Sequence, residues 1–133
     1  SDYGIRLEAV SVEDNKTFLH FTYSYSYNLV GDLAMKAYLA TIGHDKVGFT
    51  TAGGQAGSQP VYIDGVRGVV ERNTMRYYLA IVAFMEASRL APERRLEARL
   101  RSWFAAVERY PVQLHEMDQQ EYLEMKRVEA AAR

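Results

Sequence analysis

The residues best suited to acid–base or metal chemistry are the histidines, and two of the three lie next to carboxylates. His44 precedes Asp45 in the turn-like sequence GHDK, and His115 stands three residues before Asp118. Gln119 occupies the position where the zinc motif HExxH requires its second histidine. These spacings are more typical of solvated turns and helical faces, so we predict no metal site and no catalytic residue.

A row of tyrosines is the second candidate. Tyr23, Tyr25 and Tyr27 alternate with serines, so in a strand their rings share one face. We favour the inner face of a sheet for this row, because aromatic side chains suit half-buried pleated surfaces. Buried phenols need partners, however, so a ligand pocket rimmed by Tyr25 and Tyr27 is the alternative.

Two polar side chains could anchor such a ligand, namely His44 and Arg67. Arg67 could instead pair with Glu71, four residues later, and we favour that structural pairing. With Tyr38 added from a predicted helix, the candidate ligand-binding residues are Tyr23, Tyr25, Tyr27, Tyr38, His44 and Arg67.

Composition excludes several classes of function. The chain carries 16 basic and 17 acidic residues, which does not favour binding to a phosphate backbone, so we predict no nucleic acid partner. The absence of cysteine excludes disulfides, thiolate metal sites and a cysteine nucleophile. No apolar run approaches the roughly 20 residues of a membrane span, and no motif indicates a cofactor.

The N-terminal segment alternates in the manner of a β-hairpin. Asp14 and Asn15 tolerate the positive φ of a two-residue turn, which would set Val12 opposite Thr17. The apolar phase then slips within the first strand, so we predict a β-bulge near Ala9 or Val10. Beyond the bulge, Leu7 would face Phe21 and Ile5 would face Tyr23.

Further elements are predicted from hydrophobic periodicity and from capping, glycine and proline residues. We predict a helix over 32–42 with Asp32 as its N-cap, and strands over 46–52 and 60–70. Helices are predicted from residue 73 or 74 to about Leu90, then from Pro92, and then from Pro111. The residues Gly53 to Gln59 are expected to form a loop, either a lid or a linker.

Together these elements predict one α+β domain over residues 1–133, sheet-rich over 1–72 and helical over 73–133. Its antiparallel sheet would hold three to five strands, the hairpin plus later strands, with three to four helices on one face. The chain begins with Ser1 rather than methionine, so we expect a domain excised from a longer or processed protein.

No catalytic constellation stands out, so the sequence favours a non-catalytic sensory or protein-interaction domain over an enzyme. We expect its setting to be extracytoplasmic, as part of a larger membrane-anchored protein. A protein partner, or a homodimer through the C-terminal helices, would fit this function. The alternative is a small amphipathic ligand, held by a binding protein or small enzyme in a tyrosine-lined pocket between sheet and helices.

Overall fold

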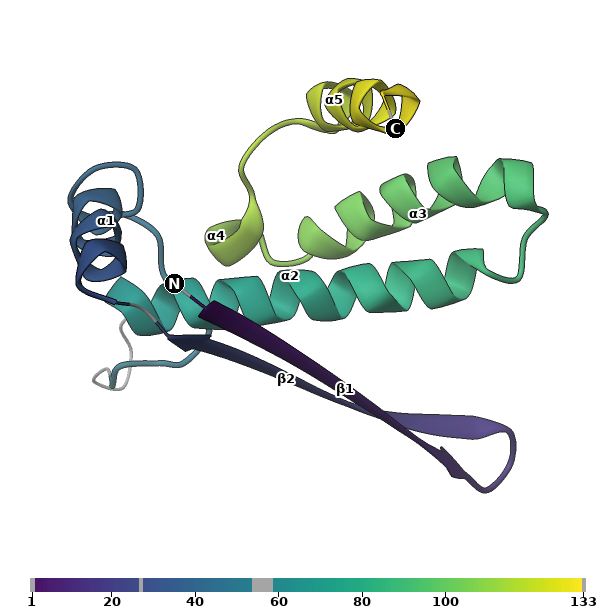
Figure 1. Cartoon of the computed structure of the whole chain (residues 1–133), viewed down its shortest axis with the longest axis horizontal. Helices are drawn as coiled ribbons and strands as arrows, with labels where there is room; N and C mark the ends of the chain where they lie inside the picture. Colours follow the sequence, from purple (N-terminus) through teal and green to yellow (C-terminus); the bar gives the residue numbers. More distant parts are fainter. Residues whose placement is uncertain (1, 27, 54–58, 133) are drawn as a thin grey trace. The chain divides into compact units, whose positions relative to one another are not determined.

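The computed structural model describes residues 2–26, 28–53 and 59–132 (Figure 1). It is a small α+β fold in which the described residues form one two-stranded antiparallel sheet and five helices. Residues group into two compact units, Ser1–Thr74 and Met75–Arg133, which are described separately. The prediction of a single domain stays a prediction.

The first unit begins with the hairpin, formed by β1 (Asp2–Val12) and β2 (Lys16–Ser26). Asp14 and Asn15 adopt φ of 63° and 58°, as expected for residues that tolerate the left-handed region. The turn nevertheless contains Glu13 as well, because Val12 pairs with Lys16 rather than with Thr17.

This three-residue turn removes the predicted bulge. The ladder is regular from one end to the other, and it includes the expected pairs Leu7 with Phe21 and Ile5 with Tyr23. The shift of apolar residues from odd to even positions along β1 is therefore not corrected by an extra residue within the strand. Instead, Val10 opposite Phe18 and Val12 opposite Lys16 place apolar side chains on the second face of the hairpin.

Helix α1 (Leu29–Ala40) begins three residues earlier than the sequence predicts. Asn28 is its N-cap, with the side-chain Oδ1 accepting a hydrogen bond from the Gly31 N–H at 3.0 Å. Asp32 is not the cap and instead pairs with Lys36 one turn later, at 2.7 Å.

The predicted sheet of three to five strands, packed by helices on one face, is wrong. Residues 48–52 and 61–63 do exchange antiparallel backbone hydrogen bonds, such as Ile63 N–H to Thr50 C=O at 2.8 Å. They form only an isolated bridge between Thr51 and Tyr62, and the hairpin is the only sheet in the described residues. The second half of the predicted strand 60–70 is helical.

That helix is α2 (Gly65–Ala87), which begins about eight residues before the predicted start. Gly65 enters it with φ of 60°, a conformation that suits glycine. Three valines follow within six residues, a composition that by itself favours a strand. The backbone approaches closely at Gly68, where a Cβ would lie 3.0 Å from the Ile63 carbonyl oxygen and 3.2 Å from the Gly48 nitrogen, so a glycine is required there.

The second unit contains the rest of α2 with α3 (Pro92–Val107), α4 (Pro111–Leu114) and α5 (Gln119–Ala131). Both prolines occupy the first turn of their helices, as predicted. The helix predicted from Pro111 is interrupted after Leu114, and Asp118 caps a new helix through its Oδ1, 3.0 Å from the Glu121 N–H.

The hydrophobic core of this unit joins α3 to α5, which lie side by side in Figure 1. Its buried residues are Leu100, Phe104, Tyr122 and Leu123, with Trp103 and Met117 packed against them. One ring contact and one ion pair support the same packing: Tyr122 stacks on Trp103 at 5.0 Å between centroids, and Arg127 reaches Glu97 at 2.7 Å. None of the described helices is both long enough and apolar enough to cross a bilayer.

Candidate functional site

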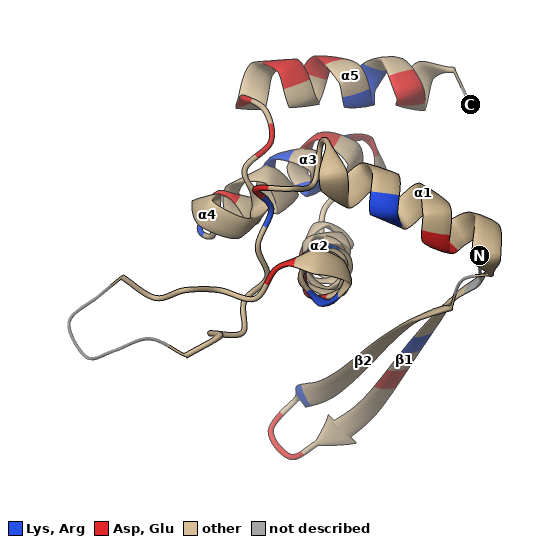
Figure 2. Cartoon of the chain, turned by 90° about the vertical axis from the view of Figure 1, so that its left-hand side faces the viewer, with Lys and Arg blue, Asp and Glu red and all other residues tan. Residues whose placement is uncertain are grey.

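The most unusual surface of the chain is apolar and lies on the hairpin. It comprises large side chains from both strands and both faces, listed here and called the hairpin surface: Tyr3, Ile5, Leu7, Val10, Val12 and Phe18. Tyr3 is 68% exposed and Phe18 is 61% exposed. Figure 2 shows how few charged residues interrupt these two strands between the turn and the strand ends.

Helix α1 continues this pattern within the same unit. None of its residues is buried, and Leu29, Val30 and Leu33 are all exposed, Leu29 at 86%. Apolar groups that remain in water forfeit about 1.5–3 kcal/mol for each large side chain that could have been buried.

The burial of the two units differs sharply. Every buried apolar side chain in the described residues lies between Leu79 and Leu123, in the second unit. The buried positions of the described first unit are three glycines and Arg72. The first unit therefore has a regular hairpin and a helix but no hydrophobic core of its own in the part of the chain that is described.

The tyrosine row has the alternation that the sequence predicts. Tyr23 and Tyr25 are half-buried on one face of β2, where they oppose Ile5 and Tyr3, while the intervening serines are exposed. Tyr27 lies outside the described residues. Tyr38 is half-buried on α1, and its ring lies so close to Gly43 that a Cβ there would collide with it.

His44 forms local contacts in the turn after α1. Its Nδ1 is 2.8 Å from the Thr41 carbonyl oxygen, and its Nε2 is 2.8 Å from Asp45 Oδ2. Both ring nitrogens thus face oxygen acceptors on an exposed turn, which stabilises that turn. His115 is likewise engaged, since its Nδ1 is 3.0 Å from Glu108.

Arg67 is part of a compact polar cluster, which we call the Glu71 cluster: Phe49, Thr50, Arg67 and Glu71. Glu71 Oε2 accepts hydrogen bonds from the backbone N–H groups of Phe49 and Thr50, both at 2.8 Å. Its Oε1 accepts from the Thr50 hydroxyl at 2.7 Å and from Arg67 Nε at 3.1 Å. The carboxylate thereby joins the first turns of α2 to residues 49–50.

These contacts determine the ionisation of Glu71. Partial burial is the largest single influence and raises its pKa, but the hydrogen bonds from Thr50, Phe49 and Arg67 together outweigh it and lower the pKa from 4.5 to about 2. A carboxylate held so firmly in its charged form is a poor proton acceptor near neutral pH. The Glu71 cluster is therefore a structural clamp, as the i,i+4 spacing of Arg67 and Glu71 indicated.

Sequence reasoning missed the other half of this clamp. It identified the Arg67–Glu71 spacing but had no signal that Glu71 would capture backbone groups more than twenty residues earlier. The same holds for Gly48, where a Cβ would lie 2.6 Å from Glu71 Oε2. The described residues contain no group of three or more histidine, aspartate or glutamate side chains placed to hold a metal ion.

Comparison with known proteins does not add to this picture, since no family model, curated protein or solved structure matches the chain. The features that bear on function are the hairpin surface, the apolar residues of α1 and the Glu71 cluster.

Proposed function

We propose that this chain is a non-catalytic protein-interaction domain, in which the hairpin surface and α1 pack against a partner protein. The observation that carries the proposal is the missing core: the apolar side chains of the first unit are exposed, and all described apolar burial lies in the second unit. Isolated two-stranded hairpins are marginally stable in water, so an eleven-residue pair gains most from a covering surface.

The partner's chemistry follows from the edge of the sheet. β1 has no second neighbouring strand among the described residues, so its outer edge can accept one. A lipid surface would cover apolar side chains but could not satisfy the backbone groups of a strand edge. We therefore infer a protein that adds an extended strand beside β1 and places apolar side chains on the hairpin surface.

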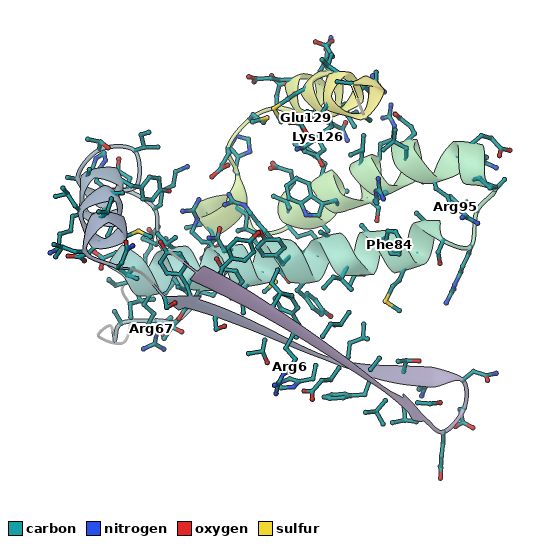
Figure 3. All side chains as sticks on the ribbon, viewed as in Figure 1. Arg6, Arg67, Phe84, Arg95, Lys126 and Glu129 are labelled. Carbon is teal, nitrogen blue, oxygen red and sulfur yellow. The ribbon has the colours of Figure 1, made fainter. Side chains whose placement is uncertain are left out.

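Charged groups on β1 would orient that strand. Arg6 and Glu8 lie on one face of β1, and Arg6 extends from the strand in Figure 3. Glu8 Oε2 is 2.9 Å from Nδ1 of His20 on the opposing strand. Opposite charges directly across a strand pair stabilise it, so a partner strand with an acidic residue opposite Arg6 is favoured.

The predicted homodimer through the C-terminal helices is less well supported than binding at the hairpin surface. Tyr122 and Leu123, the most buried residues of α5, pack within the chain against α3. Met125 and Val128 are the exposed apolar residues that such a dimer would use. The extracytoplasmic setting, the sensory role and the tyrosine-lined ligand pocket stay predictions.

Site-specific photocrosslinking in cells tests the proposal. A benzophenone amino acid replaces Leu7 on the hairpin surface, and in a control chain it replaces Val128, which is 70% exposed on α5. We expect one dominant adduct of defined mass from position 7 and none of that mass from position 128. Adding Phe18→Asp should abolish the adduct, whereas adding Val112→Asp, another exposed apolar position, should preserve it.

The contrary result is equally specific. If position 7 yields no adduct beyond those of position 128, and the β1 amides of the purified monomer are strongly protected from hydrogen exchange, the hairpin is already covered within the chain. That pair of results would refute the proposed interaction.

A further inference from the structure

The second unit contains a pocket that the proposed interaction does not use. It has a volume of about 200 Å³ and is lined by residues of α3, α4 and α5 and their connections, and by Arg76 of α2. Every lining residue belongs to the range 76–126, so the pocket lies entirely within the second unit.

Aromatic and sulfur-containing side chains form the apolar wall. Tyr122 stands between Trp103, at 5.0 Å, and Phe104, at 5.5 Å between ring centroids. Met117 and Met125 also line the pocket. Thioether sulfur makes favourable contacts with aromatic rings, and methionine adapts its shape to irregular ligands.

The wall is held in place by polar contacts at its margin. Trp103 Nε1 donates a hydrogen bond to the Arg76 carbonyl oxygen at 3.2 Å, which fixes the indole orientation. The Arg76 side chain donates to the Leu114 carbonyl oxygen at 3.4 Å and pairs with Glu116 at 2.7 Å. The pocket is therefore preorganised, which lowers the cost of binding.

The charged groups of the rim are already engaged. Besides Arg76 with Glu116, Glu108 contacts His115 at 3.0 Å, and Lys126 pairs with Glu129 at 2.8 Å; both residues of the last pair are labelled on α5 in Figure 3. A charged ligand would have to compete with one of these pairs. The rim therefore favours a neutral ligand.

We propose that this pocket binds one small neutral aromatic molecule of one or two rings. A cavity of about 150 Å³ accommodates benzene, and drug-sized ligands need pockets of at least about 300 Å³, so the size lies between these limits. The aromatic and methionine wall supplies the contacts, and the paired rim excludes charge. This binding does not depend on the hairpin surface or on any partner protein.

The chain's single tryptophan provides the measurement, because Trp103 lines the pocket. Bromobenzene is the neutral probe, since its heavy atom quenches tryptophan fluorescence on contact, and 4-bromobenzoate is its charged counterpart. We expect saturable quenching by bromobenzene with a dissociation constant of about 1 mM or below, and at least about tenfold weaker binding of 4-bromobenzoate.

Two phenylalanine variants locate the site. Met125→Phe fills the pocket and should weaken bromobenzene binding by about tenfold or more, whereas Val128→Phe, on the same helix but outside the lining, should change it less than about twofold. Met117→Phe repeats the filling from the segment between α4 and α5. Near-ultraviolet circular dichroism identifies which variants keep the native packing of Trp103 and Tyr122.

Four results would overturn the proposal. Quenching that rises linearly, as for N-acetyltryptophanamide, would show that no site exists. Equal binding of 4-bromobenzoate would refute the neutral preference, and equal effects of the lining and control variants would place the site elsewhere. Displacement of bromobenzene by a capped phenylalanine amide at lower concentration than by toluene would indicate a peptide side chain instead of a free molecule.

Discussion

Replacing Glu71 by glutamine tests the clamp between the first turns of α2 and residues 49–50. Glu71→Gln keeps the size of the side chain and one carbonyl acceptor but removes the charge that attracts two backbone N–H groups and Arg67. Because the backbone contacts are to a charged group, each is stronger than a neutral hydrogen bond. We therefore expect local opening of residues 49–50 to become easier.

The magnitude follows from the ionisation of Glu71. A pKa of about 2, against the ordinary 4.5, corresponds to at most about 3.5 kcal/mol, at about 1.4 kcal/mol per pKa unit. The Glu71 side chain is 20% exposed and that of Arg67 is 63% exposed, so solvent screens part of this energy. We expect a loss of about 1–2 kcal/mol, or roughly a five- to thirtyfold fall in amide protection at Phe49 and Thr50.

The dependence on pH has a definite sign. The lowered pKa means that the stabilisation is fully present above pH 4.5, the ordinary pKa of the group, and is lost as the pH falls toward about 2. Amide exchange followed by NMR between pH 7 and pH 2.5 should show this loss in the wild-type chain. In Glu71→Gln the protection of Phe49 and Thr50 should be low and should not vary with the ionisation of residue 71.

Glu13→Gln, at the exposed hairpin turn, is the matched control and should behave as wild type. If Glu71→Gln retains wild-type protection at Phe49 and Thr50, and the same dependence on pH, the carboxylate does not hold this junction. The assignment of Glu71 as a structural clamp would then be wrong.

Three further substitutions test the rest of the fold. Leu123→Ala, at a core position that is 4% exposed, should lower the free energy of unfolding of the second unit by about 2–5 kcal/mol in urea titrations. Val128→Ala, on the same helix, should change this free energy by less than about 0.5 kcal/mol. Equal effects of the two substitutions would contradict the packing of α5 on α3. Asp118→Ala removes the N-cap of α5 and should cost about 1 kcal/mol in the same titration, with an unchanged midpoint as the contrary result. Asn15→Val forces a β-branched residue into φ of 58° and should weaken the cross-strand NMR contacts of the hairpin. Asn15→Gly should preserve these contacts. Unaltered contacts in the valine variant would contradict the positive φ of residue 15.

Local sequence signals were sufficient for much of the second unit. Pro92 and Pro111 mark helix starts because a residue without an N–H is tolerated in a first turn. On α3 the buried residues are Leu100, Phe104 and Val107, whose spacing matches the 3.6-residue period of a helix with one buried face. The sequence did not predict the break after Leu114, which was read as part of one continuous helix.

In the first unit, local sequence signals predicted only part of the structure. Alternation correctly identified the hairpin, its positive-φ residues and the shared face of Tyr23 and Tyr25. It predicted a two-residue turn of Asp14 and Asn15, whereas the turn also contains Glu13, and it predicted a bulge because Val10 and Val12 were expected to share the buried face of Leu7. In the structure both are exposed on the opposite face, so the assumption of a buried core for every apolar residue failed.

The residues around α2 depend most on tertiary structure. Three valines soon after Gly65 favour a strand locally, yet this segment is helical, and it is held to residues 48–50 by the close approach at Gly48 and Gly68 and by the hydrogen bonds of Glu71 with the N–H groups of Phe49 and Thr50. Where the sequence identified an element and its regularity correctly, as for Tyr23 and Tyr25 on β2, it also determined which residues share a face, since that depends only on the period of the element. Only the tertiary structure decided what each face meets, because those contacts join residues far apart in the chain, for which spacing carries no signal.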